Sequence, residues 1–141
     1  MYFLFAFLFL TLSGCQADRL SVVNQYVNET RLASYHVGTP DPLLLCPPLG
    51  QELLITWNLP PKQFCQGEIH LLVRVKLGNG EEQSEESVLK KPSGTYIFSL
   101  MNDAFFETEG ITAYLVQLIQ GDTVIDEWRT SLFYERIEIK S

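Results

Sequence analysis

The chain has 141 residues, the length of one ordinary domain, and 46% of them are hydrophobic. Its 17 acidic residues outnumber its 10 basic residues, giving a formal net charge of −7, which argues against nucleic acid as a partner because phosphate binding needs clustered Lys and Arg. An aromatic content of 12% argues against a disordered chain, and three cysteines are too few for a disulfide scaffold.

The amino-terminal segment has the features of an export signal. No charged residue precedes Cys15, and residues 2–12 are apolar at every position except Thr11. An apolar run of about eleven residues is too short to span a bilayer, which takes about 20 residues of helix, but it matches the hydrophobic region of a secretory signal. We therefore predict a signal peptide over residues 1–14.

The end of this segment, Leu12-Ser13-Gly14-Cys15, resembles the bacterial lipobox. The resemblance implies a diacylglycerol group on the Cys15 thiol, cleavage just before Cys15 and a lipid-anchored lipoprotein. Because Gln16 is not Asp, it also implies the outer membrane, facing the periplasm. The segment departs from a typical signal in having no early Lys or Arg. An ordinary cleaved signal with an incidental Cys15, or a buried core helix, are the alternatives.

The next stretch, residues 15–30, is predicted to be a tether. It is rich in polar residues, and Leu20, Val23 and Val27 have the i, i+3, i+7 spacing of a short amphipathic helix. Three apolar residues do not fix a helix, so a flexible tether and a short helix both remain open. Asn28-Glu29-Thr30 also fits an N-glycosylation acceptor, a minor alternative that would suit a eukaryotic secreted protein.

Residues 31–141 are predicted to form one domain of β-strands, because apolar residues there recur at every second position. Gly78-Asn79-Gly80 and Gly121-Asp122 predict hairpin turns, since they accept positive φ. The acidic segment Glu81–Leu89 predicts an edge strand, and 112–119, apolar on both faces, predicts a central strand. We expect a bulge near Tyr134–Arg136. The expected strands are Arg31–Val37, 51–59, 69–77, 81–89, 95–100, 112–119 and a last one from about Val124.

Seven strands without intervening helices indicate an all-β antiparallel sandwich. Leu53-x-Ile55-x-Trp57 and Thr112-x-Tyr114-x-Val116-x-Leu118 are similar to the core Trp strand and the penultimate strand of fibronectin type III and immunoglobulin-like domains. The resemblance covers roughly residues 31–136 and implies a seven-stranded sandwich of that kind. Met101–Gly110 departs from it as a longer insert. The resemblance implies no particular function.

No residue pattern in the chain predicts catalysis, a cofactor or a metal site. His36 and His70 lack the spacing of metal ligands, and there is no Gly-x-Ser-x-Gly nucleophile elbow. The glutamates of residues 81–86 are expected to form a solvated edge instead of a Ca²⁺ site or an acid–base pair. We therefore expect a protein that is not an enzyme and needs no cofactor.

Cys46 and Cys65 flank the predicted strand 51–59. An eight-residue strand spans about 26 Å, whereas the Cα atoms of a disulfide lie within about 7 Å, so the two cysteines should not pair unless residues 47–50 double back. We expect free, buried thiols.

These features predict a non-catalytic lipoprotein of the cell envelope that presents a β-sandwich to an envelope protein partner. Phe105 and Phe106 are the candidate partner surface, and the alternative is that they cap the core. The second candidate function is a secreted or periplasmic domain that binds a small ligand or carbohydrate through Trp57 or Trp128. Strand parity places both Trp side chains in the core, which disfavours this second function.

Overall fold

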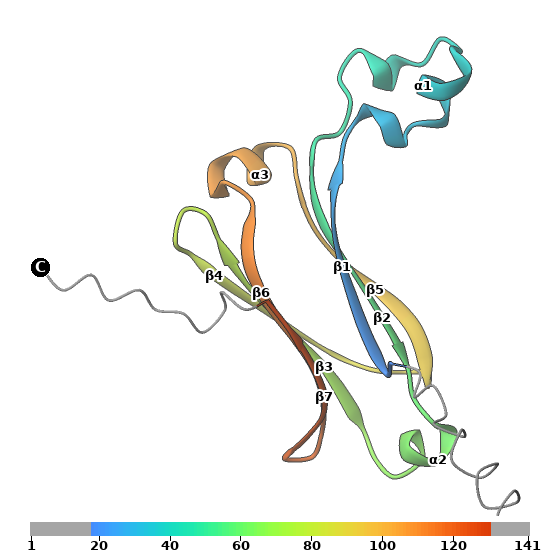
Figure 1. Ribbon diagram of the computed structural model, residues 1–141, viewed down its shortest axis with the longest axis vertical. Helices are drawn as coiled ribbons and strands as arrows, with labels where there is room; N and C mark the ends of the chain where they lie inside the picture. The colour runs from blue at the N-terminus through green and yellow to red at the C-terminus, as the bar shows by residue number, and fades with distance from the viewer. Residues whose placement is uncertain (1–17, 131–141) are drawn as a thin grey trace, which may run out of the picture.

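The computed structural model describes residues 18–130, in which seven strands form two antiparallel sheets packed face to face (Figure 1). The three-stranded sheet has the order β1-β2-β5, and the four-stranded sheet has the order β4-β3-β6-β7. The strands are β1 Leu20–Val27, β2 Gly50–Asn58, β3 Ile69–Leu77, β4 Glu82–Val88, β5 Ser93–Met101, β6 Ile111–Gln120 and β7 Thr123–Arg129. The all-β sandwich predicted from the sequence is thus confirmed, and its layout is compatible with immunoglobulin and fibronectin III-like domains.

Alternation along the strands builds the core between the sheets. Every second side chain of β3 is buried, and β2 contributes Leu53, Ile55 and Trp57 from the opposite sheet. Each fully buried aliphatic side chain contributes roughly 1.5–3 kcal/mol, so these two faces supply much of the driving force for folding. The buried β3 residues are Ile69, Leu71, Val73, Val75 and Leu77.

The hairpins and the edge strand follow the sequence prediction. Strands β3 and β4 are joined through a turn in which Gly80 has φ of 88°, and β6 and β7 through a turn in which Gly121 has φ of 61°. Every residue of β4 is exposed, and it lies at the edge of its sheet. Strand β6 lies between β3 and β7, which explains why both of its faces are apolar.

The prediction for the start of the domain is wrong. The first strand is Leu20–Val27, inside the stretch expected to be a tether or a short helix, and residues 33–37 of the expected first strand form helix α1 instead. Leu20 and Val22 point into the core with period two, because β1 pairs with β2 along its whole length. The sandwich therefore begins near residue 20 and not at residue 31. The predicted signal segment 1–14 and the predicted bulge near Tyr134–Arg136 lie outside the described residues.

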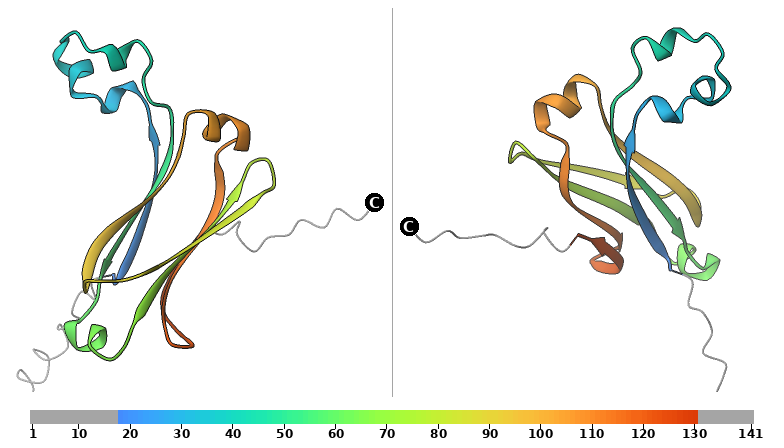
Figure 2. Two further views of the ribbon diagram at one scale, coloured as in Figure 1. Left: turned by 180° about the vertical axis from the view of Figure 1, so that it is seen from behind. Right: turned by 45° about the horizontal axis from the view of Figure 1, so that its top comes forward.

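Residues 28–49, which join β1 to β2, form an excursion beyond the sandwich (Figure 2). The segment consists of the 3-10 helix η1 (Glu29–Arg31), helix α1 (Ala33–Val37) and the 3-10 helix η2 (Pro42–Leu44), and none of these contains a buried residue. Two further short helices are α2 (Pro61–Phe64), after β2, and α3 (Asp103–Thr108), between β5 and β6.

Candidate functional site

The two ends of the sandwich carry different elements (Figure 2). We call the end that carries the excursion and α3 the distal end. The opposite end, where the described chain begins beside α2 and the β4–β5 connection, is the proximal end. The two are separated by the length of β2, whose nine residues span about 30 Å at roughly 3.3 Å per residue.

The distal end exposes several large apolar side chains of the excursion. Leu45 is 90% exposed and Val37 is 69% exposed, and Tyr35 and Leu43 are also exposed. The excursion also contains a shallow hollow of about 410 Å³, which is lined by Leu44, Leu45 and the turn around Asp41. Hydrogen bonds to Asp41 stabilise its local fold: the Asp41 carboxylate accepts from the Ser34 hydroxyl and from the backbone N–H of Leu43. Together these two hydrogen bonds hold the pKa of Asp41 below its usual value.

Helix α3 separates the two phenylalanines that the sequence suggested as one surface. Phe105 is partly buried and packs against the core, whereas Phe106 is 62% exposed. Their rings meet edge to face, with centroids 5.5 Å apart. Adjacent helical residues point about 100° apart, so one ring faces inward and the other faces solvent. Only Phe106 is therefore available to a partner.

A buried glutamine links the two sheets beside the end of α3. The side chain of Gln51, on β2, is 2% exposed and accepts a hydrogen bond of 2.8 Å from the backbone N–H of Ile111, the first residue of β6. Its amide nitrogen donates to Asn24 at 2.9 Å and to the Ile111 carbonyl at 3.3 Å. The backbone N–H of Asn102 donates to the Leu49 carbonyl at 2.7 Å, which ties the start of α3 to the excursion.

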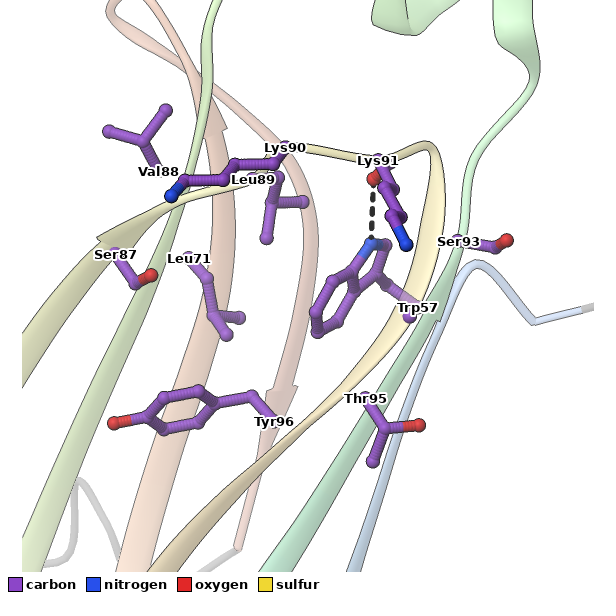
Figure 3. Close-up of a pocket in the computed structure, with 11 residues that line it drawn as sticks. Trp57, Leu71, Ser87, Val88, Leu89, Lys90, Lys91, Ser93, Thr95 and Tyr96 are labelled. Atoms are coloured by element: carbon purple, nitrogen blue, oxygen red, sulfur yellow. Dashed lines mark hydrogen bonds between the residues drawn. The ribbon is translucent and has the colours of Figure 1, made fainter.

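At the proximal end, a groove of about 380 Å³ opens between the sheets beside the β4–β5 connection (Figure 3). Its floor includes the buried side chains of Trp57, Leu71 and Leu89, and Lys90 and Lys91 lie on its rim. The Trp57 indole N–H donates to the Lys91 carbonyl at 3.1 Å, which fixes the ring in the wall of the groove.

Tyr96 forms another part of the groove wall and reaches the edge strand. Its hydroxyl donates to the Glu85 carboxylate. This hydrogen bond is the main cause that raises the pKa of Tyr96 to about 12, and partial burial and the negative charge of Glu85 raise it further. The phenol therefore remains a donor throughout the neutral range and cannot act as a base there.

The second tryptophan differs from the prediction. Trp57 is 9% exposed, as its strand parity suggested, but Trp128 is 36% exposed, so placing it in the core was wrong. Trp128 lies on the edge strand β7 and is paired with Val116 of β6, so only one side of it has a neighbouring strand of its own sheet.

The cysteines lie at opposite ends of β2. Cys46 and Cys65 are unpaired, as the strand length predicted, but both are exposed, so the expectation of buried thiols was wrong. Cys46 lies in the excursion, which contributes nothing to the core, and Cys65 is the residue that ends α2. Cys15 lies outside the described residues.

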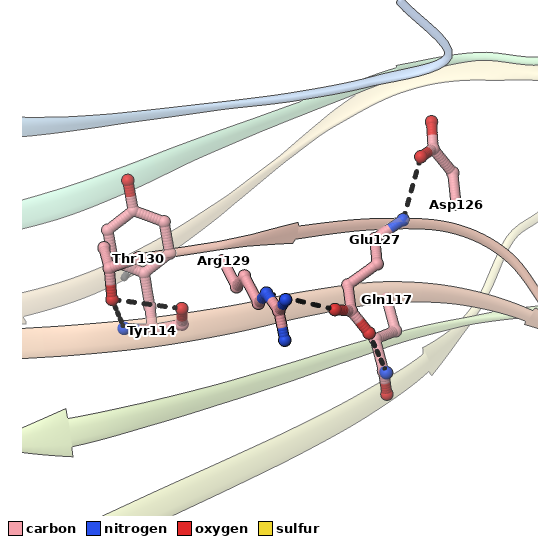
Figure 4. A network of polar contacts seen from close by, with 6 residues as sticks. All are labelled: Tyr114, Gln117, Asp126, Glu127, Arg129 and Thr130. Carbon is pink, nitrogen blue, oxygen red and sulfur yellow. Dashed lines mark hydrogen bonds and ion pairs between the residues drawn. The ribbon is translucent and has the colours of Figure 1, made fainter. Parts of the chain in front are cut away.

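Several polar side chains on the outer face of the four-stranded sheet form hydrogen bonds and ion pairs with one another. On β6 and β7, Gln117 donates to Glu127 at 2.6 Å, and Arg129 lies 3.7 Å from the same carboxylate (Figure 4). On β3, the His70 Nδ1 lies 2.8 Å from the Glu86 carboxylate. These are cross-strand contacts of a solvated sheet face, and they assemble no nucleophile–base pair.

Within residues 18–130, no group of three or more His, Cys, Asp or Glu side chains is placed to hold a metal ion. None of the helices in this region combines the length and the apolar character that crossing a membrane requires. Comparisons with protein-family models, with curated proteins and with solved structures find no match for the chain.

Proposed function

We propose that the chain is a non-catalytic envelope lipoprotein, in which an immunoglobulin or fibronectin III-like sandwich presents its distal end to an envelope protein partner. The observation that carries the proposal is the excursion, residues 28–49. It is ordered into three short helical turns without burying a single residue. Fixing a backbone costs roughly 1–2 kcal/mol per residue, and the sandwich core does not offset that cost here.

The chemistry of the distal end indicates what such a partner offers. Leu45 and Phe106 are large apolar side chains in solvent, a type that is typical of protein contact surfaces. Around them the end is acidic: residues 28–49 and 102–110 contain five acids and one Lys or Arg side chain, Arg31, which is paired with Glu52 at 2.8 Å. The partner surface therefore combines an apolar centre with a basic rim. The acids of this end are Glu29, Asp41, Asp103, Glu107 and Glu109.

The proposed anchor agrees with this direction of presentation. In the lipobox interpretation the mature chain begins at Cys15, and β1 begins at Leu20 at the proximal end. An acyl group on Cys15 holds the proximal end near the bilayer, so the distal end extends away from it by about the length of β2. Gln16 favours the outer membrane, with the domain in the periplasm.

Site-directed photocrosslinking in cells tests the partner surface. A photoreactive residue replaces Leu45 in one variant and Ile97 in the control, because Ile97 is 52% exposed on β5, away from the distal end. We expect a discrete crosslinked species from position 45 and none from position 97. The double variant Leu43→Ser/Leu45→Ser should lose that species with unchanged thermal unfolding. Equal crosslinking from both positions would contradict the proposal.

Membrane fractionation tests the anchor separately. The variant Cys15→Ser should move from the membrane fraction to the soluble periplasmic fraction, and the wild type should incorporate labelled palmitate. Unchanged fractionation of the variant would remove the lipoprotein part of the proposal and leave the partner surface in place.

The second candidate function is binding of a small ligand or carbohydrate in the proximal groove, and the observation that favours it is the Trp57 indole in the groove wall. Ligand entry should change the fluorescence of Trp57 in a Trp128→Phe background. A panel of glycans and amphiphiles that leaves this fluorescence unchanged would exclude this function.

A further inference from the structure

Unpaired basic side chains gather at the proximal end. Arg19, Lys62, Lys90 and Lys91 have no carboxylate partner within the described residues, and the three lysines are exposed. The arginines elsewhere in residues 18–130 behave differently: Arg31, Arg74 and Arg129 each pair with a glutamate.

Hydrogen bonds hold these four side chains at one end, although they come from three separate segments. The Arg19 carbonyl accepts from the N–H of Asn58 at 2.9 Å, and its guanidinium donates to Gln63 of α2 at 3.4 Å. The Leu59 N–H donates to the Pro92 carbonyl at 2.8 Å, which places the Lys90-Lys91 turn beside the end of β2.

The charged side chains of the described residues are distributed unevenly between the two ends of the sandwich. The acids near the proximal end are Asp18, Glu68, Glu86 and Asp122, of which Glu68 and Glu86 lie 3.9 and 2.8 Å from His70, so acids and Lys or Arg side chains are equal in number there. Residues 28–49 and 102–110 of the distal end instead contain five acids and one arginine, which is paired with Glu52. Within residues 18–130, the four cations at the end where β1 begins are thus the ones without a carboxylate partner, in a chain whose net charge is −7.

We infer that the proximal end docks on the surface of an anionic bilayer, with these four cations against lipid phosphates. The orientation rests on the proposed lipid anchor. Leu20 is five residues after Cys15, a distance of at most about 17 Å when the chain is extended. Screening at physiological ionic strength acts over about 8 Å, so this link holds the start of the domain within about two screening lengths of the surface. The contact fixes the tilt of the sandwich and points the excursion away from the membrane.

The two exposed cysteines allow the orientation to be measured on the mature chain of the lipobox interpretation, residues 15–141. In the Cys15→Ser background, a fluorophore is placed on Cys65 (with Cys46→Ser) or on Cys46 (with Cys65→Ser). Each protein is mixed with vesicles of phosphatidylcholine alone, or of phosphatidylcholine with phosphatidylglycerol, that contain a spin-labelled quencher lipid. We expect quenching at position 65 only, with the anionic vesicles only, and less of it as salt is added.

Matched charge variants test which residues carry the contact. Each cation near an anionic surface contributes roughly a fivefold factor to binding, so Lys90→Gln/Lys91→Gln should weaken binding to anionic vesicles about thirtyfold. The control Gln83→Glu/Ser99→Glu makes the same change in net charge on exposed strand positions away from the proximal end, and it should retain most of the binding.

Three results would overturn the docking: no quenching at position 65, equal quenching at both labels, or equal losses in the lysine and control variants. The first is also the result expected if the cations face an acidic protein instead of lipid. Because these measurements omit the acyl group, they fail or succeed independently of the lipoprotein proposal, which fractionation decides.

Discussion

The hydrogen bonds of Gln51 give the sharpest stability prediction. Replacing Gln51 by Leu keeps the volume and apolar contact of the side chain but leaves the N–H and the carbonyl of Ile111 without their partner, in a site where Ile111 is 8% exposed. Each unsatisfied buried peptide group costs about 1–3 kcal/mol, and the added apolar surface returns about 1 kcal/mol. We expect Gln51→Leu to lower the free energy of unfolding by about 3 kcal/mol, a large share of the roughly 5–15 kcal/mol that a domain has.

Urea unfolding followed by Trp fluorescence measures this loss, which corresponds to a midpoint about 1.5 M lower for an m-value of about 2 kcal/mol/M. The control is Gln25→Leu, because Gln25 is half-buried and hydrogen-bonded only to the side chain of Glu52, at 3.3 Å. It should change stability by less than about 0.5 kcal/mol. Amide exchange at Ile111 should accelerate in Gln51→Leu alone. Equal midpoints for the two variants would refute the assignment of Gln51 as a structural clamp.

Three further outcomes are expected. Gly94→Ala places a methyl carbon 2.6 Å from the Trp57 ring and should destabilise the domain by about 1–3 kcal/mol; a wild-type midpoint would show that the ring moves aside. The Glu85 hydrogen bond raises the folded pKa of Tyr96 to about 12, so the stabilisation it gives is complete below about pH 10 and is lost as pH rises toward 12. In Tyr96→Phe the free energy of unfolding should therefore depend less on pH in that window, and an unchanged pH dependence would contradict the assignment. Phe105→Ser should lower stability by about 3 kcal/mol, since this ring packs on the core, and thermal unfolding no different from wild type would place it on the surface.

Much of the sandwich was predictable because a strand's alternation is local. The segments 53–59 and 69–77 have apolar residues at every second position along their whole length. Glycine-containing turns follow the segments 69–77 and 112–119. The charge of Glu81–Leu89 likewise marked an edge. These signals need no knowledge of a partner strand, since each one reflects the burial of a single face.

The errors arose where burial depends on a neighbour far away in sequence. The few apolar residues of β1 also fit the spacing of a helix, and this segment is a strand because it pairs with β2. Trp128 has the parity of a core residue, yet its position on an edge strand leaves it in solvent.

The sequence by itself determined the period of the strands, the turns between them and the export signal that it predicts. Only the tertiary structure decided which strands share a sheet, that Phe105 packs on the core while Phe106 faces solvent, and that the helices of the excursion contain no buried residue. It also brought Arg19, Lys62 and the Lys90-Lys91 turn to one end, through hydrogen bonds between segments that are distant in the chain. Alternation specifies that a face is apolar, whereas the burial of that face and the meeting of distant charges depend on sheet pairing.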